Sequence, residues 1–146
     1  MLLNFQKQFV AKILRKEKRH TIRAKRKRRP RVGEICHNYT GLRQKGARLL
    51  GRWPCVKVQD VMIDVHPITG FGMVFVDFEC LSLDEREALA ISDGFVSFSQ
   101  MLLFWKGRLP FVGDMIHWDP DQPAKWTAKS RRASKAKRPA EGVKRK

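Results

Sequence analysis

A short segment near the N-terminus holds three polar side chains whose spacing lets them act together: Lys18, Thr21 and Arg23. Thr21 and Arg23 are two positions apart, so on a β-strand both side chains point to the same face. Lys18 precedes Thr21 by three residues, where a turn leaving a helix can fold its long side chain back over that face. A hydroxyl, an amine and a guanidinium would then converge on one pocket suited to a polar, nucleotide-like ligand.

These groups could support nucleophilic catalysis without a metal. A threonine hydroxyl attacks poorly unless a base takes its proton, and a desolvated lysine among cations has a lowered pKa that suits it to this role. The positive charges of Arg15 and Arg19 would lower the pKa of Lys18, and Arg23 or backbone N–H groups would stabilise a developing oxyanion. The alternative is that Lys18 and Arg23 bind an anion while Thr21 satisfies a backbone group.

The charge of the chain points to a polyanionic partner. The 146 residues include 31 Lys and Arg against 14 acidic residues, which gives a formal net charge of +17. Such an excess favours nucleic acid first and an anionic membrane surface second. The only acidic residues before Asp60 are Glu17 and Glu34, so one face of the fold should be strongly positive.

Clusters of cations mark three segments as candidate contacts for a phosphate backbone. Residues 25–29 are five consecutive cations that no core position could hold, so they form either a solvated loop or a phosphate contact. A basic, glycine-punctuated loop over 40–51 and the C-terminal tail are the other two. The candidate nucleic-acid-binding residues are Lys25, Arg26, Lys27, Arg28, Arg29, Arg31, Arg43, Lys45, Arg131 and Arg132.

Hydrophobic periodicity predicts an α+β fold. Apolar residues at three- and four-residue spacing predict an amphipathic helix over 3–14, and Ser97 is a good N-cap for a later helix. A change of alternation at Gln59-Asp60 predicts a bulge or bend such as a small barrel needs at its corners. We expect the strands 53–65 and 71–78 to form a hairpin and 71–78 to be buried on both faces. The other expected elements are strands at 20–24, 32–39 and 111–118 and helices at 83–91 and 97–105.

Composition divides the chain into a domain over 1–121 and a basic tail over 122–146. After Pro123 the chain has ten cations against the single acid Glu141, and we expect this tail to be disordered. Such a tail raises affinity for nucleic acid without adding sequence specificity. Trp126, alone among these cations, is a candidate for stacking on a base.

Other residue types argue against several protein classes. The three widely spaced cysteines form no CxxC pair, so we expect no disulfide framework and a reducing, cytoplasmic location. No apolar run is long enough to span a bilayer, and we expect no membrane partner. The basic, amphipathic N-terminus is similar in composition to a mitochondrial transit peptide. We favour instead a role for these residues in the folded domain, next to the segment around Lys18. Histidines and cysteines lack metal-ligand spacing, so we expect no metal and no cofactor.

The order of these features resembles the ASCH family, whose small β-barrel is related to the PUA domain. The family's signature after a first helix is Gly-x-Lys-x-x-Glu-x-Arg; here Lys18 and Arg23 match its Lys and Arg, while Lys16 and Thr21 replace its Gly and Glu. The resemblance spans about residues 3 to 119 and includes Val32-Gly33-Glu34, Asp93-Gly94-Phe95 and the strand Phe111 to Trp118. It implies a PUA-like/ASCH β-barrel flanked by helices.

One branch of that family has Thr at the Glu position: the small bacterial amidohydrolases that cleave N(4)-acetylcytidine. A Lys, a Thr and a downstream Glu are assigned to catalysis in this branch. The resemblance therefore implies catalytic roles for Lys18 and Thr21, with Asp93, one methylene shorter, nearest to the place of the Glu. Arg23 would contact the substrate, and Tyr39, at a strand end beside the basic loop, could line the pocket mouth.

Two functions remain open at this point. One is an amidohydrolase that binds a cytidine-like nucleoside or RNA base and hydrolyses an N(4)-acyl amide without a metal. The other is a non-catalytic nucleic-acid-binding module that uses the basic loop and tail, with RNA favoured over DNA. A ribonuclease would suit a basic chain, but no pair of histidines supports it.

Overall fold

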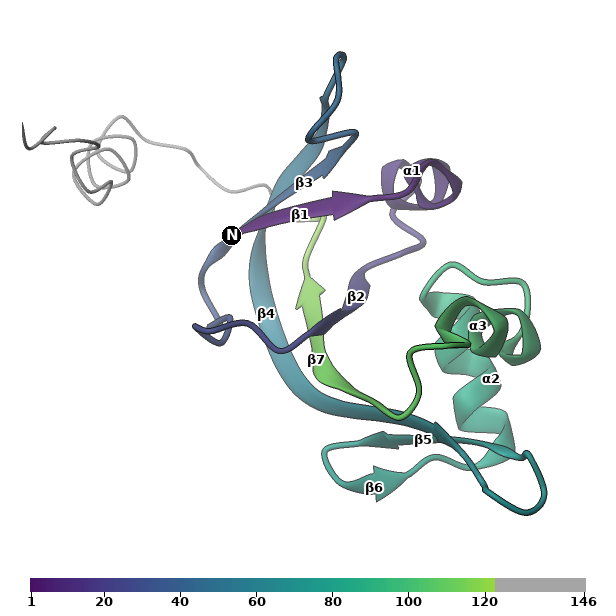
Figure 1. The fold of residues 1–146 in the computed structure, drawn as a ribbon. Coiled ribbons are helices and arrows are strands. Elements are labelled where there is room, and N and C mark those ends of the chain that lie inside the picture. The colour runs from purple at the N-terminus through teal and green to yellow at the C-terminus, as the bar shows by residue number, and fades with distance from the viewer. Residues whose placement is uncertain (123–146) are drawn as a thin grey trace, which may run out of the picture.

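The longest strand, β4 (Arg48–Val65), is the element on which most of the sheet is built. A computed structural model describes residues 1–122, which form an α+β fold with a mixed sheet of seven strands and three helices (Figure 1). The α+β class expected from the periodicity is therefore confirmed. The other elements are β1 (Leu2–Phe5), α1 (Lys7–Leu14), β2 (His20–Ala24), β3 (Ile35–Thr40), β5 (Gly72–Val76), β6 (Glu79–Cys80), α2 (Leu83–Ser92), α3 (Phe98–Trp105) and β7 (Phe111–Trp118).

The two halves of β4 have different partners. Its first part pairs with β3, which is parallel to β1 on its other side, and its later part pairs with β7 and β5. β2 pairs with β7, so the sheet curls through β1, β3, β4, β7 and β2. Within the described residues no strand pairing joins β1 to β2, and the sheet is not closed. Instead, Arg23 and Arg26 reach from the β2 side to carbonyl oxygens of Asn4 and Leu2 in β1.

The N-terminal residues form a strand where the sequence predicted the first turns of a helix. The helix predicted over 3–14 begins only at Lys7, because residues 2–5 pair with β3 in parallel. Leu3 and Phe5 are buried and alternate with exposed Leu2 and Asn4, which is the two-residue period of a strand. Apolar residues at positions 3, 5 and 9 fit either period locally, and pairing with β3 decides between them.

The core lies between the curled sheet and the helices. Phe9 of α1 packs edge-on against Phe95, which follows α2, with ring centroids 5.4 Å apart. Trp118 of β7 stacks near Trp53 of β4. The largest fully buried side chains include Trp118, Leu3, Ile13, Ile63, Met101 and Ile116.

Several finer predictions can be compared with the described residues. The hairpin of β4 and β5 is confirmed, and so is Ser97 as an N-cap, since its hydroxyl accepts from the Gln100 N–H. Of the bulge or bend predicted at Gln59-Asp60, the bulge is wrong: the register with β7 shifts between Cys55 and Lys57. The segment 71–78 is not buried on both faces, because Phe71 and Phe78 are 49% and 86% exposed. The predicted loop over 40–51 ends early, because β4 already begins at its residue 48.

The predicted basic tail falls almost entirely outside the described residues. Trp126, Arg131 and Arg132 all lie in 123–146, so their proposed contacts with nucleic acid stay predictions. In the part of the chain that is described, no helix is both long enough and apolar enough to cross a membrane.

Candidate functional site

A pocket of about 390 Å³ opens where the sheet is left open between β1 and β2. Polar groups from distant parts of the chain form part of its wall, and aromatic rings form much of the rest. It is lined by Asn4, Phe5, Gln6, Phe9, Lys18, Thr21, Ile22, Arg23, Ala24, Asp93, Phe95, Phe104, Trp105, Arg108 and Phe111. The pocket therefore brings together all three residues of the Lys18-Thr21-Arg23 segment and adds Asp93 from the end of α2.

Lys18 and Asp93 form a buried ion pair. Lys18 Nζ lies 2.6 Å from Asp93 Oδ1 and also donates to the Asp93 carbonyl, and the two residues are only 2% and 4% exposed. Lys12 of α1 donates from its Nζ, at 3.0 Å, to the carbonyl of Gly94, the residue that follows Asp93. Two lysines thus fix the backbone between α2 and α3 beside the pocket.

Burial moves this pair toward its uncharged forms. Desolvation lowers the pKa of Lys18 and raises the pKa of Asp93, because each group loses the water that stabilises its charge. The charge of each partner opposes that shift, and the nearby Arg23 lowers the pKa of Lys18 further. A lysine with a lowered pKa is more readily available as a base than one in water.

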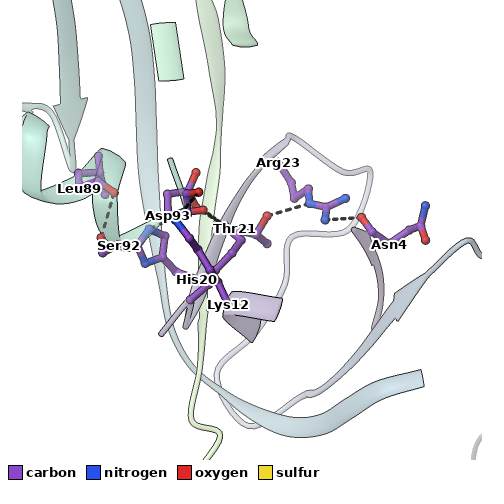
Figure 2. Close-up of polar contacts among 10 residues, drawn as sticks. Asn4, Lys12, His20, Thr21, Arg23, Leu89, Ser92 and Asp93 are labelled. Carbon is purple, nitrogen blue, oxygen red and sulfur yellow. Dashed lines mark hydrogen bonds and ion pairs between the residues drawn. The ribbon is translucent and has the colours of Figure 1, made fainter. Parts of the chain in front are cut away.

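Arg23 connects Thr21 to β1, as Figure 2 shows. Its Nε donates to Thr21 Oγ1 at 3.1 Å and its Nη2 donates to the Asn4 carbonyl at 2.6 Å. The guanidinium also lies 4.8 Å from the centre of the Phe5 ring. Burial lowers the pKa of Arg23 to about 10, with a further contribution from Arg26. Because Thr21 Oγ1 accepts from Arg23, its own proton is left to be donated to a base.

His20 belongs to this cluster, although no sequence pattern assigned it to the site. Its Nε2 lies 3.3 Å from Asp93 Oδ1, and Figure 2 shows its ring beside that carboxylate. His20 is opposite His117 in the β2–β7 register, with ring centroids 5.2 Å apart. Burial lowers the pKa of His20 to about 3 and that of His117 to about 4, so both rings are neutral at pH 7. Strand alternation alone would have placed His20 away from Thr21.

The segment between α2 and α3 requires a glycine at position 94. Its φ of +105° is a backbone conformation that side chains disfavour, and an added Cβ would lie 2.8 Å from Phe9 Cδ1. The close approach of α1 to this corner brings Lys12 and Lys18 to the two carbonyl oxygens. The Asp93-Gly94-Phe95 sequence therefore has a structural reason at the pocket.

The predicted binding residues outside the pocket are more dispersed. Tyr39 is half-buried in β3 and does not line the Lys18 pocket. Lys25 and Arg29 pair with Asp60 and Asp114, which lie opposite each other on β4 and β7. Arg28 pairs with Glu34, while Lys27, Arg31, Arg43 and Lys45 are exposed.

Sequence reasoning also missed most of the aromatic wall of the pocket. Phe5 and Phe9 fit the apolar stripe of the helix predicted over 3–14, and no sequence pattern places Arg108 beside them. Arg108 places its guanidinium 4.5 Å from the centre of the Trp105 ring at the pocket. Only the packing of α1 and α3 across the opening of the sheet brings these rings together.

Comparison with known proteins gives no further guide. No protein-family model matches the chain, and no curated protein and no solved structure matches it. Within residues 1–122 no group of three or more His, Cys, Asp and Glu side chains could hold a metal ion. The pocket itself therefore carries the functional inference: a lysine, a hydroxyl and a guanidinium beside aromatic rings.

Proposed function

We propose that the chain is an ASCH-type protein with a PUA-like fold that binds a cytidine-like nucleoside or RNA base and hydrolyses its N(4)-acyl amide. One observation carries the proposal. Lys18, Thr21, Arg23 and Asp93 line the same pocket, although Asp93 is 75 residues from Lys18 in the sequence. Lys18, Thr21 and Arg23 are the residue types that the resemblance to N(4)-acetylcytidine amidohydrolases implies, and Asp93 stands in place of the Glu of that branch.

The walls of the pocket suit a planar base. Phe5, Phe9, Phe95 and Trp105 present aromatic rings to it, and stacking on such rings stabilises a nucleobase by about 1–3 kcal/mol. Polar groups of the lining, among them Thr21 and Arg23, can orient the ring and meet its exocyclic substituent. A base in this pocket would carry its N(4)-acyl group to Thr21.

The chemistry follows from the shared position of Thr21 and Lys18 in the lining of one pocket. In its neutral form, which burial favours by lowering its pKa, Lys18 accepts the Thr21 proton as Oγ1 attacks the acyl carbon, and Arg23 stabilises the negative charge on the carbonyl oxygen. Collapse breaks the C–N bond, and the leaving amine takes the proton back from Lys18, which releases cytidine and leaves an acyl ester on Thr21. Water then hydrolyses the ester to the carboxylic acid. Asp93 positions Lys18 throughout.

The direct test is release of cytidine from N(4)-acetylcytidine by the purified chain in the presence of a chelator. We expect Thr21→Ala to reduce turnover by about 10³-fold or more while the variant still binds the nucleoside. Thr21→Ser keeps a hydroxyl and should retain part of the activity. Thr69→Ala, in an exposed turn, is the matched control and should behave like the wild type. If the unmodified chain releases no cytidine, it is not a hydrolase of this amide.

The second candidate is an RNA-binding module without catalysis, and the exposed cations Lys27, Arg31, Arg43 and Lys45 favour it. It predicts RNA binding with a steep dependence on salt and no release of cytidine. Charge reversal over 25–29 should abolish RNA retention, whereas Thr21→Ala should leave it intact. The enzyme predicts instead that Thr21→Ala abolishes the release of cytidine while leaving polyanion affinity intact.

A further inference from the structure

We propose that the Lys18 pocket continues into a phosphate subsite formed by Arg23, Arg26 and Arg43. The preferred ligand is then a cytidine that carries a phosphate, either as a nucleotide or within an RNA strand, which binds more tightly than the free nucleoside. This inference rests on the proposed function, because it takes the base to occupy the Lys18 pocket. Its own evidence is a second hollow and the charges around it.

The second hollow adjoins the first. It has a volume of about 620 Å³ and shares Asn4 and Arg23 with the Lys18 pocket. Arg26, Leu42, Arg43 and Gln44 complete much of its lining. A ligand that fills the base pocket can therefore extend past Arg23 into this hollow, where it meets two further guanidinium groups.

Among the described residues, the positive charges of the arginines in this hollow are not neutralised by carboxylates. Arg26 Nη2 donates to the Leu2 carbonyl at 2.9 Å and Arg23 donates to a carbonyl and a hydroxyl, so their acceptors are neutral. Within residues 1–122 none of Arg23, Arg26 and Arg43 forms an ion pair with a carboxylate, and the lining of the hollow includes no acidic residue. Lys25, Arg28 and Arg29 of the same basic segment do pair with carboxylates.

The hollow is held in shape before any ligand binds. Asn4 Oδ1 accepts from the Leu42 N–H at 3.1 Å, and Thr40 Oγ1 donates to the Phe5 carbonyl at 2.8 Å. These bonds fix the segment that carries Arg43 to β1, the strand that also borders the base pocket. A preformed site loses less conformational entropy on binding than one that must order a loop.

Arginine is also the residue whose geometry suits a phosphate. Its planar guanidinium offers five N–H donors and can bind two phosphate oxygens at once. Arg23 uses Nε for Thr21 and Nη2 for Asn4, so its remaining donors can reach an anion. One side chain can therefore contact both the reacting hydroxyl and the phosphate, which would align the acyl group with Thr21.

The test compares N(4)-acetylcytidine with its 5′-monophosphate and 3′-monophosphate, by calorimetric binding and by release of the deacylated product. We expect at least one phosphate to raise affinity by about 10-fold or more. Arg26→Gln and Arg43→Gln should each remove most of that gain, and Arg43→Gln, whose side chain does not line the base pocket, should leave binding of the nucleoside unchanged. Arg28→Gln is the matched control: it removes the same charge from the same basic segment but a side chain paired with Glu34, and it should keep the gain.

A third arm separates a nucleotide from an RNA strand. A short oligoribonucleotide with one N(4)-acetylcytidine should bind more tightly than either monophosphate if the ligand is a strand. Each lost phosphate contact should then lower the slope of log K against log salt concentration by about 0.7. Equal affinity for the strand and a monophosphate would assign the subsite to a single nucleotide and leave the arginines in their role.

The failures of the two proposals are distinguishable. If the nucleoside binds and reacts but neither phosphate adds affinity, or if Arg26→Gln and Arg43→Gln keep the full gain, the phosphate subsite is wrong and the amidohydrolase stands. If neither the nucleoside nor its phosphates bind or react, the base pocket itself is wrong, and the subsite falls with it.

Discussion

Lys18 Nζ lies 2.6 Å from Asp93 Oδ1, and both side chains are almost wholly buried. Asp93 directly follows α2, and Lys18 lies two residues before β2, so this contact joins the helical corner to the sheet. Burying an ion pair costs desolvation energy, so the pair as a whole adds little to stability. Removing one partner is strongly destabilising, because it leaves the other charge buried without compensation. The pair therefore has a measurable structural role apart from any chemistry.

Lys18→Met should lower the free energy of unfolding by about 3 kcal/mol, because it leaves a buried carboxylate without its partner. Urea denaturation at pH 7 measures the change. The double variant Lys18→Met with Asp93→Asn removes both charges and should recover part of the loss. If the double variant is less stable by the sum of the two single losses, the ion pair contributes nothing as a pair.

Gly94→Ala should destabilise the fold by about 2 kcal/mol or more. The alanine would have to adopt a φ of +105°, and its Cβ would meet the Phe9 ring at 2.8 Å. Gly107→Ala is the matched control, since Gly107 has a φ of +86° but open space around an added Cβ. We expect a loss of only about 1 kcal/mol there. Equal losses by urea denaturation would show that the contact with Phe9 carries no cost.

Acid should destabilise the fold through His20 and His117. Burial lowers the pKa of His20 to about 3 and of His117 to about 4, whereas both titrate near 6.5 when unfolded. Between these values the unfolded chain binds more protons than the folded chain, so stability is full above pH 6.5 and falls as the pH drops toward 4.

Urea denaturation across this pH range checks the sign and the source of the effect. For His20 the expected loss is up to about 1.4 kcal/mol per pH unit. His20→Gln should flatten the profile between pH 6.5 and 4, while the exposed-turn variant Thr69→Ala should keep the profile of the wild type. A profile that does not change in His20→Gln would contradict a buried neutral His20.

Lys25→Gln should destabilise the fold more than the same change at Lys27. Lys25 Nζ lies 2.6 Å from a carboxylate oxygen of both Asp60 and Asp114, and Asp114 is buried. Removing this cation leaves two carboxylates opposite each other on β4 and β7 with Arg29 as their remaining cation, at an expected cost of about 1–2 kcal/mol. Lys27 is exposed and its substitution should cost less than about 0.5 kcal/mol. Equal thermal stability of the two variants would contradict this account.

The sequence by itself determined the parts of the protein that depend on local chemistry. The apolar stripe of α1, the Ser97 cap and the hairpin of β4 and β5 follow from periodicity and side-chain hydrogen bonding, and the structure confirms them. The two-residue spacing also placed Thr21 and Arg23 on one face of β2, where they are hydrogen bonded.

Only the tertiary structure decided which distant groups meet in the pocket. Asp93 reaches Lys18 because α1 packs against the corner between α2 and α3, and His20 faces His117 because β2 pairs with β7 in one register. The first residues became β1 because β3 offered a parallel partner. Such contacts depend on strand register and on packing between elements far apart in the chain, and local residue patterns do not predict either.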